Sequence, residues 1–252
     1  MTIGKLRTFW IIVLSSLYMV NTCGQSMLMG LLGKINRLWV NKMLQTWARR
    51  TLKTVKVKCV VVNPHQVEPK KGKPTIIMCN HSSHYDVPLS FLAFPKQSIR
   101  MLAKKELFKI PVIGKGMVAA EFPSIDRHNK QQAIQDLHTV RELMESGIVI
   151  WLAPEGTRSD GSCLTPFKKG GFITAIKAGA EIIPMGIRGA NKILPARTFK
   201  FNLGQTAEIH IGEPIDASQY TLETKELLIE KTYIAMQKLA GVPASHDRGS
   251  HS

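Results

Sequence analysis

The chain begins with a long stretch that contains no charged side chain. No Asp, Glu, Lys or Arg occurs from Thr8 to Gly33, which is 26 residues. A helix of this length, rising about 1.5 Å per residue, exceeds the hydrocarbon thickness of a bilayer, which is about 30 Å. The stretch therefore predicts a membrane-associated segment, and a single transmembrane span is one form that it can take.

Two other forms of this segment remain open. The apolar run ends at Asn21-Thr22-Cys23-Gly24-Gln25-Ser26, whose polar and small residues would lie near the centre of the bilayer in a single span. A re-entrant or interfacial segment fits these residues as well. A cleaved signal peptide is the third possibility, because Lys5 and Arg7 precede the apolar run, but no good small-x-small cleavage site follows it.

The next segment, Lys34 to Thr54, has the pattern of an amphipathic helix with a basic side. Its apolar residues recur at intervals of three and four, and its cations are Arg37, Arg49, Arg50 and Lys53. The apolar residues are Ile35, Leu38, Trp39, Met43, Leu44 and Trp47. Tryptophans beside arginines are typical of a helix at the lipid headgroups. The alternative is a helix packed on its own domain.

The distribution of charge suggests a partner that carries phosphates. The net charge is +16, and the first acidic residue is Glu68. Anionic phospholipid and nucleic acid both fit such a charge. We favour a membrane surface and expect no nucleic-acid partner, because the cations accompany an apolar segment and no nucleic-acid motif is recognisable. The four cysteines lack zinc-ligand spacing, so we expect no metal site and reduced thiols on the cytoplasmic side.

From residue 55 onward, short apolar runs alternate with helical patterns. This alternation predicts an α/β domain, for which we expect a mixed, mostly parallel sheet flanked by helices. The predicted division is a membrane-associated helical region at 1–54, an α/β domain at 55–241 and a disordered tail at 242–252. Helices are expected near 87–93, 130–144, 168–177 and 222–239, and strands near 55–62, 74–80, 98–103, 117–122, 147–154, 181–187 and 207–212.

One candidate catalytic pair lies where a predicted strand meets a predicted helix. His81 and Asp86 stand in the run Asn80-His81-Ser82-Ser83-His84-Tyr85-Asp86. Open α/β sheets bind ligands at the carboxyl ends of their strands, which makes this loop a candidate cleft. A helix cap at Asp86 is the structural alternative. The pair is weak evidence alone, since eight histidines give such a spacing by chance about one time in three.

Three further blocks make the pattern specific. They are Ile125-Asp126-Arg127, Pro154-Glu155-Gly156-Thr157-Arg158-Ser159 and Ile183-Pro184. In this order, from about Lys73 to Arg188, the blocks resemble those of the 1-acyl-sn-glycerol-3-phosphate acyltransferase family. The resemblance implies transfer of a fatty acyl group from acyl-CoA or acyl-carrier protein to the sn-2 hydroxyl of lysophosphatidic acid, giving phosphatidic acid. It implies direct transfer without an acyl-enzyme or bound cofactor, at the cytoplasmic face of a membrane.

The resemblance also suggests roles for individual residues. His81 would act as general base, because imidazole has a pKa close to working pH, and Asp86 would orient its ring. The predicted phosphate-binding group comprises Lys104, Arg127, Glu155, Gly156, Thr157 and Arg158. In this group the arginines would form paired bonds to phosphate, and Glu155 would hold the loop or an arginine and not contact phosphate directly. We expect surface or structural roles for His84 and His128.

Two kinds of alternative function remain. One is an acyltransferase with another acceptor, such as glycerol-3-phosphate or a different lysolipid. The other is a basic membrane-binding or nucleic-acid-binding protein that catalyses nothing.

Overall fold

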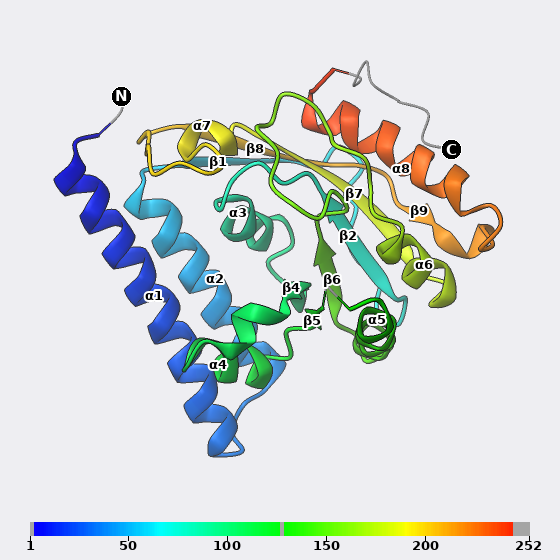
Figure 1. The fold of residues 1–252 in the computed structure, drawn as a ribbon, viewed down its shortest axis with the longest axis horizontal. Helices are drawn as coiled ribbons and strands as arrows, with labels where there is room; N and C mark the ends of the chain where they lie inside the picture. Colours follow the sequence, from blue (N-terminus) through cyan, green and yellow to red (C-terminus); the bar gives the residue numbers. More distant parts are fainter. Residues whose placement is uncertain (1–2, 127–128, 244–252) are drawn as a thin grey trace.

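The computed structural model describes residues 3–126 and 129–243 (Figure 1). Most of the predicted tail at 242–252 lies outside the described residues. The helices are α1 (Lys5–Leu31), α2 (Arg37–Thr54), α3 (Asp86–Ala93), α4 (Ile113–Ala119), α5 (Lys130–Glu145), α6 (Gly170–Lys177), α7 (Ala190–Ile193) and α8 (Lys225–Ala240), with 3-10 turns η1 (Lys105–Lys109) and η2 (Ala217–Gln219). The strands are β1 (Lys58–Val62), β2 (Thr75–Cys79), β3 (Ile99–Met101), β4 (Ala103–Lys104), β5 (Ser124–Ile125), β6 (Val149–Leu152), β7 (Glu181–Arg188), β8 (Thr206–Ile211) and β9 (Ile215–Asp216).

The main sheet is mixed and mostly parallel, as the sequence predicted. Its strand order is β1-β8-β7-β2-β6-β3, and β9 adds to β7. Four neighbouring pairs are parallel: β1 with β8, β7 with β2, β2 with β6, and β6 with β3. The pairs of β7 with β8 and with β9 are antiparallel. Strand β2 therefore lies inside the sheet, between β7 and β6.

Helices cover both faces of the sheet, which explains why its central strands are apolar throughout. In β2, Ile77 and Cys79 belong to a core shared with α2 and α3, whereas Ile76 and Met78 belong to a core shared with α5, α6 and α8. Successive side chains of a strand point to opposite faces, so both sets are buried. Figure 1 shows α3 between the sheet and α2, and α6 and α8 on the other side.

Helix α1 is continuous through the polar run Asn21 to Ser26. Its buried residues are Ile11, Thr22, Cys23 and Ser26, so three of the four are polar or small. Large apolar side chains lie on its outer side, and Leu6 and Phe9 are 74% and 58% exposed. Helix α1 is the one helix of the described residues that is long and apolar enough to cross a membrane. Thr22, Cys23 and Ser26 of the polar run thus form an inner packing surface, and the run does not interrupt the helix.

Helix α4 corrects the prediction of a strand at residues 117–122. Residues 117–119 belong to this helix, which packs against α1. The contact is close because Gly116 has no side chain: a Cβ there would lie 2.2 Å from the carbonyl oxygen of Cys23. Small residues allow two helix backbones to approach in this way. The apolar run alone did not distinguish a short buried helix from a strand.

Helix α2 begins three residues later than the predicted segment at 34–54, ends at the predicted residue and packs more deeply than an interfacial helix. Trp47, which we expected at the lipid headgroups, is 8% exposed and meets the ring of Phe91 edge to face. Gln45 donates a hydrogen bond from Nε2 to the carbonyl oxygen of Phe91 at 2.6 Å. Helix α2 is therefore attached to α3, and that expectation for Trp47 was wrong.

Two further helices begin later than predicted. Helix α6 starts at Gly170 and α8 starts at Lys225. Before α8, the backbone N–H of Thr221 donates to Oγ1 of Thr224 at 2.8 Å, which closes a turn. Thr side chains compete for backbone groups in this manner, so a periodic pattern overestimates the helix.

Candidate active site

The loop of residues 80–86 leaves the carboxyl end of β2 and leads into α3. Its first residue is fixed to the neighbouring strand β7 by two hydrogen bonds. Asn80 donates from Nδ2 to the carbonyl oxygen of Ile187 at 3.0 Å, and Ile187 donates its N–H to Oδ1 of Asn80 at 2.7 Å. The loop therefore starts from a rigid position at the centre of the sheet.

His81 and Asp86 are directly hydrogen-bonded. The distance from Nδ1 of His81 to Oδ2 of Asp86 is 2.9 Å. The same oxygen accepts the backbone N–H groups of Ser82 and Ser83, at 2.7 and 2.8 Å. Asp86 is fully buried at the first turn of α3, where the helix dipole favours a negative charge. The carboxylate is thus held in one orientation by three donors.

This arrangement differs from a helix cap. The residue that precedes α3 is Tyr85, and its side chain caps nothing. Asp86 accepts N–H groups of the preceding loop and not the free N–H groups of its own helix. The carboxylate therefore shapes the loop around the imidazole of His81.

The geometry selects one tautomer of His81. Because Nδ1 donates its proton to Asp86, Nε2 carries a lone pair. No residue in the described part of the chain hydrogen-bonds to Nε2, and the side chain is 20% exposed. The ring meets Trp151 edge to face, with centroids 6.0 Å apart. His81 can therefore accept a proton from a group that enters from outside.

Glu155 connects three segments of the site. Its Oε1 accepts the backbone N–H of His81 at 3.0 Å. Its Oε2 accepts both the N–H and the hydroxyl of Thr165, each at 2.9 Å. The side chain is almost completely buried. Glu155 therefore fixes the backbone at His81, and no pattern in the sequence pointed to Thr165 as its partner.

The other predicted phosphate-binding residues are only partly brought together. Arg158 is half-buried, and Ser159 beside it donates its N–H to the carbonyl oxygen of His81 at 2.8 Å, so this loop adjoins the loop of residues 80–86. Gly156 has φ +76°, and Thr157 is exposed. Lys104 is exposed on β4. Arg127 lies outside the described residues.

Arg158 lies close enough to His84 to influence its protonation. Although the side chain of His84 is exposed, crowding by neighbouring protein lowers its pKa, and the positive charge of Arg158 lowers it further. His84 is therefore neutral at neutral pH. In its neutral form it adds no positive charge beside His81.

The nucleophiles next to His81 in the sequence, Cys79, Ser82 and Ser83, are buried. Ser82 is buried, and the hydroxyl of Ser83 donates to the carbonyl oxygen of Leu194 at 2.8 Å. Burial raises the pKa of the Cys79 thiol well above its usual value, and the negative charges of Asp86 and Glu155 raise it further. A buried protonated thiol is a poor nucleophile.

The chain is similar to known acyltransferases in sequence and in fold. Residues 58–188 match the family model described as Acyltransferase. The 1-acyl-sn-glycerol-3-phosphate acyltransferase of Haemophilus influenzae is 32% identical over 176 residues, which cover 68% of this chain and 70% of the relative. The BAT2 enzyme of the same name, chloroplastic, from Brassica napus is 34% identical over 154 residues, 61% of this chain and 44% of the relative.

A solved structure supports the fold across nearly the whole chain. The crystal structure of the 1-acyl-sn-glycerophosphate acyltransferase PlsC from Thermotoga maritima matches with a TM-score of 0.76 at 23% identity, covering 94% of each chain. The matched part of the chain spans 60% of the length of an acyltransferase of Schizosaccharomyces pombe and 44% of the length of the Brassica enzyme. The resemblance seen in the four blocks is confirmed: the chain belongs to the acyltransferase family and, within it, to the 1-acyl-sn-glycerol-3-phosphate acyltransferases.

Proposed function

We propose that the protein transfers a fatty acyl group from acyl-CoA or acyl-carrier protein to the sn-2 hydroxyl of 1-acyl-glycerol-3-phosphate, giving phosphatidic acid. The observation that carries this proposal is the bond between His81 and Asp86, which leaves Nε2 of His81 with a lone pair at the carboxyl edge of the sheet. The similarity to enzymes of this name supports the choice of acceptor.

In the proposed reaction, Nε2 of His81 takes the proton of the sn-2 hydroxyl as its oxygen attacks the thioester carbonyl carbon. The carbonyl electrons move onto oxygen, and Asp86 stabilises the imidazolium. When the tetrahedral intermediate collapses, the new ester remains and the C–S bond breaks. The thiolate leaves and takes the proton from His81. No acyl-enzyme is needed, in agreement with the burial of Ser82 and Cys79.

We assign the phosphate of the acceptor to the loop of residues 156–158. Arg158 offers paired donors that suit a phosphate, and the backbone at Gly156 and Thr157 can add N–H groups. Lys104 and Arg127 would complete the group. Glu155 would serve this site indirectly, since it already accepts three hydrogen bonds from His81 and Thr165.

We further propose that α1 and α2 lie together in one leaflet of the membrane, with the active site at the cytoplasmic face. The two helices form a hairpin and pack side by side (Figure 1). If α1 crossed the bilayer, α2 would accompany it and carry Lys42, Arg49 and Arg50 into hydrocarbon, at a cost of about 2.5 kcal/mol or more for each charge. An interfacial hairpin leaves these cations among the headgroups and places the apolar side of α1 in lipid.

A panel of acceptors with one acyl-CoA donor tests the proposed substrate. Release of free thiol would be compared with lysophosphatidic acid, glycerol-3-phosphate, a lysophospholipid with a larger headgroup and a lyso-amino-acid lipid. We expect lysophosphatidic acid to give the highest kcat/KM. Higher kcat/KM with another acceptor would reassign the substrate, and no thiol release with any acceptor would contradict the reaction.

A further inference from the structure

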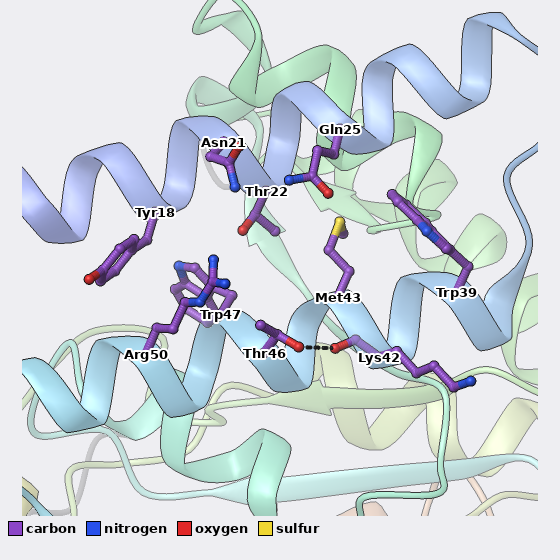
Figure 2. A pocket seen from close by; sticks show the side chains of 10 residues that line it. All are labelled: Tyr18, Asn21, Thr22, Gln25, Trp39, Lys42, Met43, Thr46, Trp47 and Arg50. Carbon is purple, nitrogen blue, oxygen red and sulfur yellow. Dashed lines mark hydrogen bonds between the residues drawn. The ribbon is translucent and has the colours of Figure 1, made fainter.

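A groove lined by both polar and apolar side chains lies between α1 and α2, and the proposed reaction does not use it. Its cavity volume is about 330 Å³. Figure 2 shows side chains of both helices around it. Those that matter here are Tyr18, Asn21 and Gln25 from α1, and Lys42, Trp39 and Arg50 from α2. We call this feature the hairpin groove.

Charge in the hairpin groove is entirely positive. None of its lining residues is acidic. Within the described chain, neither Lys42 nor Arg50 forms an ion pair with a carboxylate. The carboxylate of Glu121, which reaches α2, is bound by Arg37 at 2.7 Å. Two cations without acidic partners create a site for an anion.

The uncharged residues of the hairpin groove add hydrogen-bond donors. The amides of Asn21 and Gln25 and the hydroxyl of Tyr18 lie on α1, and Arg50 of α2 faces this helix, whereas the side chain of Lys42 runs along α2 away from Arg50 (Figure 2). In Figure 2 the side chain of Arg50 rises from α2 toward α1. Guanidinium and amide groups that converge from two sides suit the oxygens of a phosphate.

Apolar residues beside the hairpin groove favour a lipid over a free phosphate. Leu17 and Val20 adjoin Tyr18 and Asn21 along α1, and both are exposed. Trp39 lies at the groove on α2. A phosphate in the groove would thus have apolar surface next to it, where acyl chains can lie.

We propose that the hairpin groove binds the phosphate of one anionic bilayer phospholipid. The site is separate from the catalytic loop, because α3 lies between α2 and strand β2 (Figure 1). This inference rests on the proposed location of the hairpin in the membrane. The bound lipid would fix the hairpin at headgroup depth and so set the height of the active site.

Isothermal titration of the full chain in neutral detergent micelles tests this site. The probes are short-chain phosphatidylglycerol, short-chain phosphatidylcholine and inorganic phosphate. We expect phosphatidylglycerol to bind the wild type, and the double variant K42Q/R50Q to bind it about tenfold more weakly or worse, since charge-assisted bonds to phosphate are lost. The matched control R49Q/K53Q removes two cations from the same helix outside the groove, and it should change affinity by about twofold or less.

Every other outcome overturns the proposal. Equal losses in the two double variants would indicate general attraction to a basic surface. Inorganic phosphate that binds as tightly as phosphatidylglycerol would indicate a free-phosphate site, and equally tight phosphatidylcholine would remove the requirement for an anion. Absence of binding to the wild type would exclude the site. Because titration does not measure acyl transfer, a failure here is distinct from a failure of the proposed reaction in the acceptor panel.

Discussion

Strand β2 buries mostly apolar residues, whereas three of the four residues that helix α1 buries are polar or small. All five residues of β2 are buried, and they are mostly apolar. Helix α1 buries Ile11, Thr22, Cys23 and Ser26 and exposes leucines together with Phe9 and Trp10. Both arrangements place apolar side chains away from water if α1 is surrounded by lipid and the α/β domain is surrounded by water. In the proposed function, the hairpin of α1 and α2 (the hairpin region) positions the protein at the membrane, and the loop of residues 80–86 (the loop region) carries out the chemistry.

The largest expected effect belongs to the loop region. Asp86→Asn keeps the shape of the side chain but removes the charge that stabilises the imidazolium and fixes its tautomer. We expect kcat to fall by about 10³-fold or more, while binding to vesicles stays unchanged. Asp160→Asn, at an exposed position, serves as the control and should retain activity. An active Asp86→Asn enzyme would mean that the carboxylate only shapes the loop.

A large side chain at the contact of α1 with α4 should destabilise the hairpin region. In Gly116→Val, the new Cβ would collide with the backbone of Cys23. We expect the free energy of unfolding to fall by about 3 kcal/mol, measured by denaturant titration in micelles. Lys115→Val introduces the same residue at an exposed position of α4 and should cost much less. Equal losses would show that α1 does not pack closely on α4.

A negative charge on the outer side of α1 should weaken membrane binding and leave the chemistry of the loop region intact. Phe9→Glu removes an exposed ring from the proposed lipid-facing side. We expect vesicle binding to weaken by about 10- to 100-fold, because the transfer of one large apolar side chain is worth about 1.5–3 kcal/mol. Turnover of micellar substrate should persist.

The matched control for this variant is Ile234→Glu, which adds the same charge at an exposed apolar position of α8, on the opposite side of the molecule. It should leave flotation with vesicles unchanged. If both variants lose vesicle binding equally, α1 is not the membrane-facing element.

The smallest expected effect concerns the ion pair that links α2 of the hairpin region to Glu121, just after α4. Arg37 of α2 bonds Glu121, and this hydrogen bond lowers the pKa of Glu121 below its usual 4.5. A lowered carboxyl pKa contributes stability that is complete above 4.5 and disappears as pH falls through the folded value. Arg37→Gln should therefore lower stability by about 1 kcal/mol or less near neutral pH, and should reduce its loss on acidification. An unchanged acid limb in thermal melts at several pH values would contradict this link.

Local patterns in the sequence predicted much of this architecture. The alternation of apolar runs predicted the mixed sheet and four helices, and the family resemblance carried by the four blocks predicted the contact between His81 and Asp86. Contacts between distant segments could not be predicted in this way. The bond from Glu155 to the backbone of His81 joins residues 74 positions apart. The buried side of α1 packs closely on α4 because Gly116 has no side chain. Residues 117–119, which were predicted as part of a strand, belong to this helix.

The most direct test of the account measures release of free thiol from acyl-CoA and from acyl-carrier protein, with and without lysophosphatidic acid. Wild type and His81→Ala would be compared in vesicles, with His84→Ala as the control from the same loop. We predict acceptor-dependent release in wild type and in His84→Ala, and a loss of about 10³-fold or more in His81→Ala with unchanged vesicle binding. Full activity of His81→Ala would remove His81 from the mechanism and contradict the central claim.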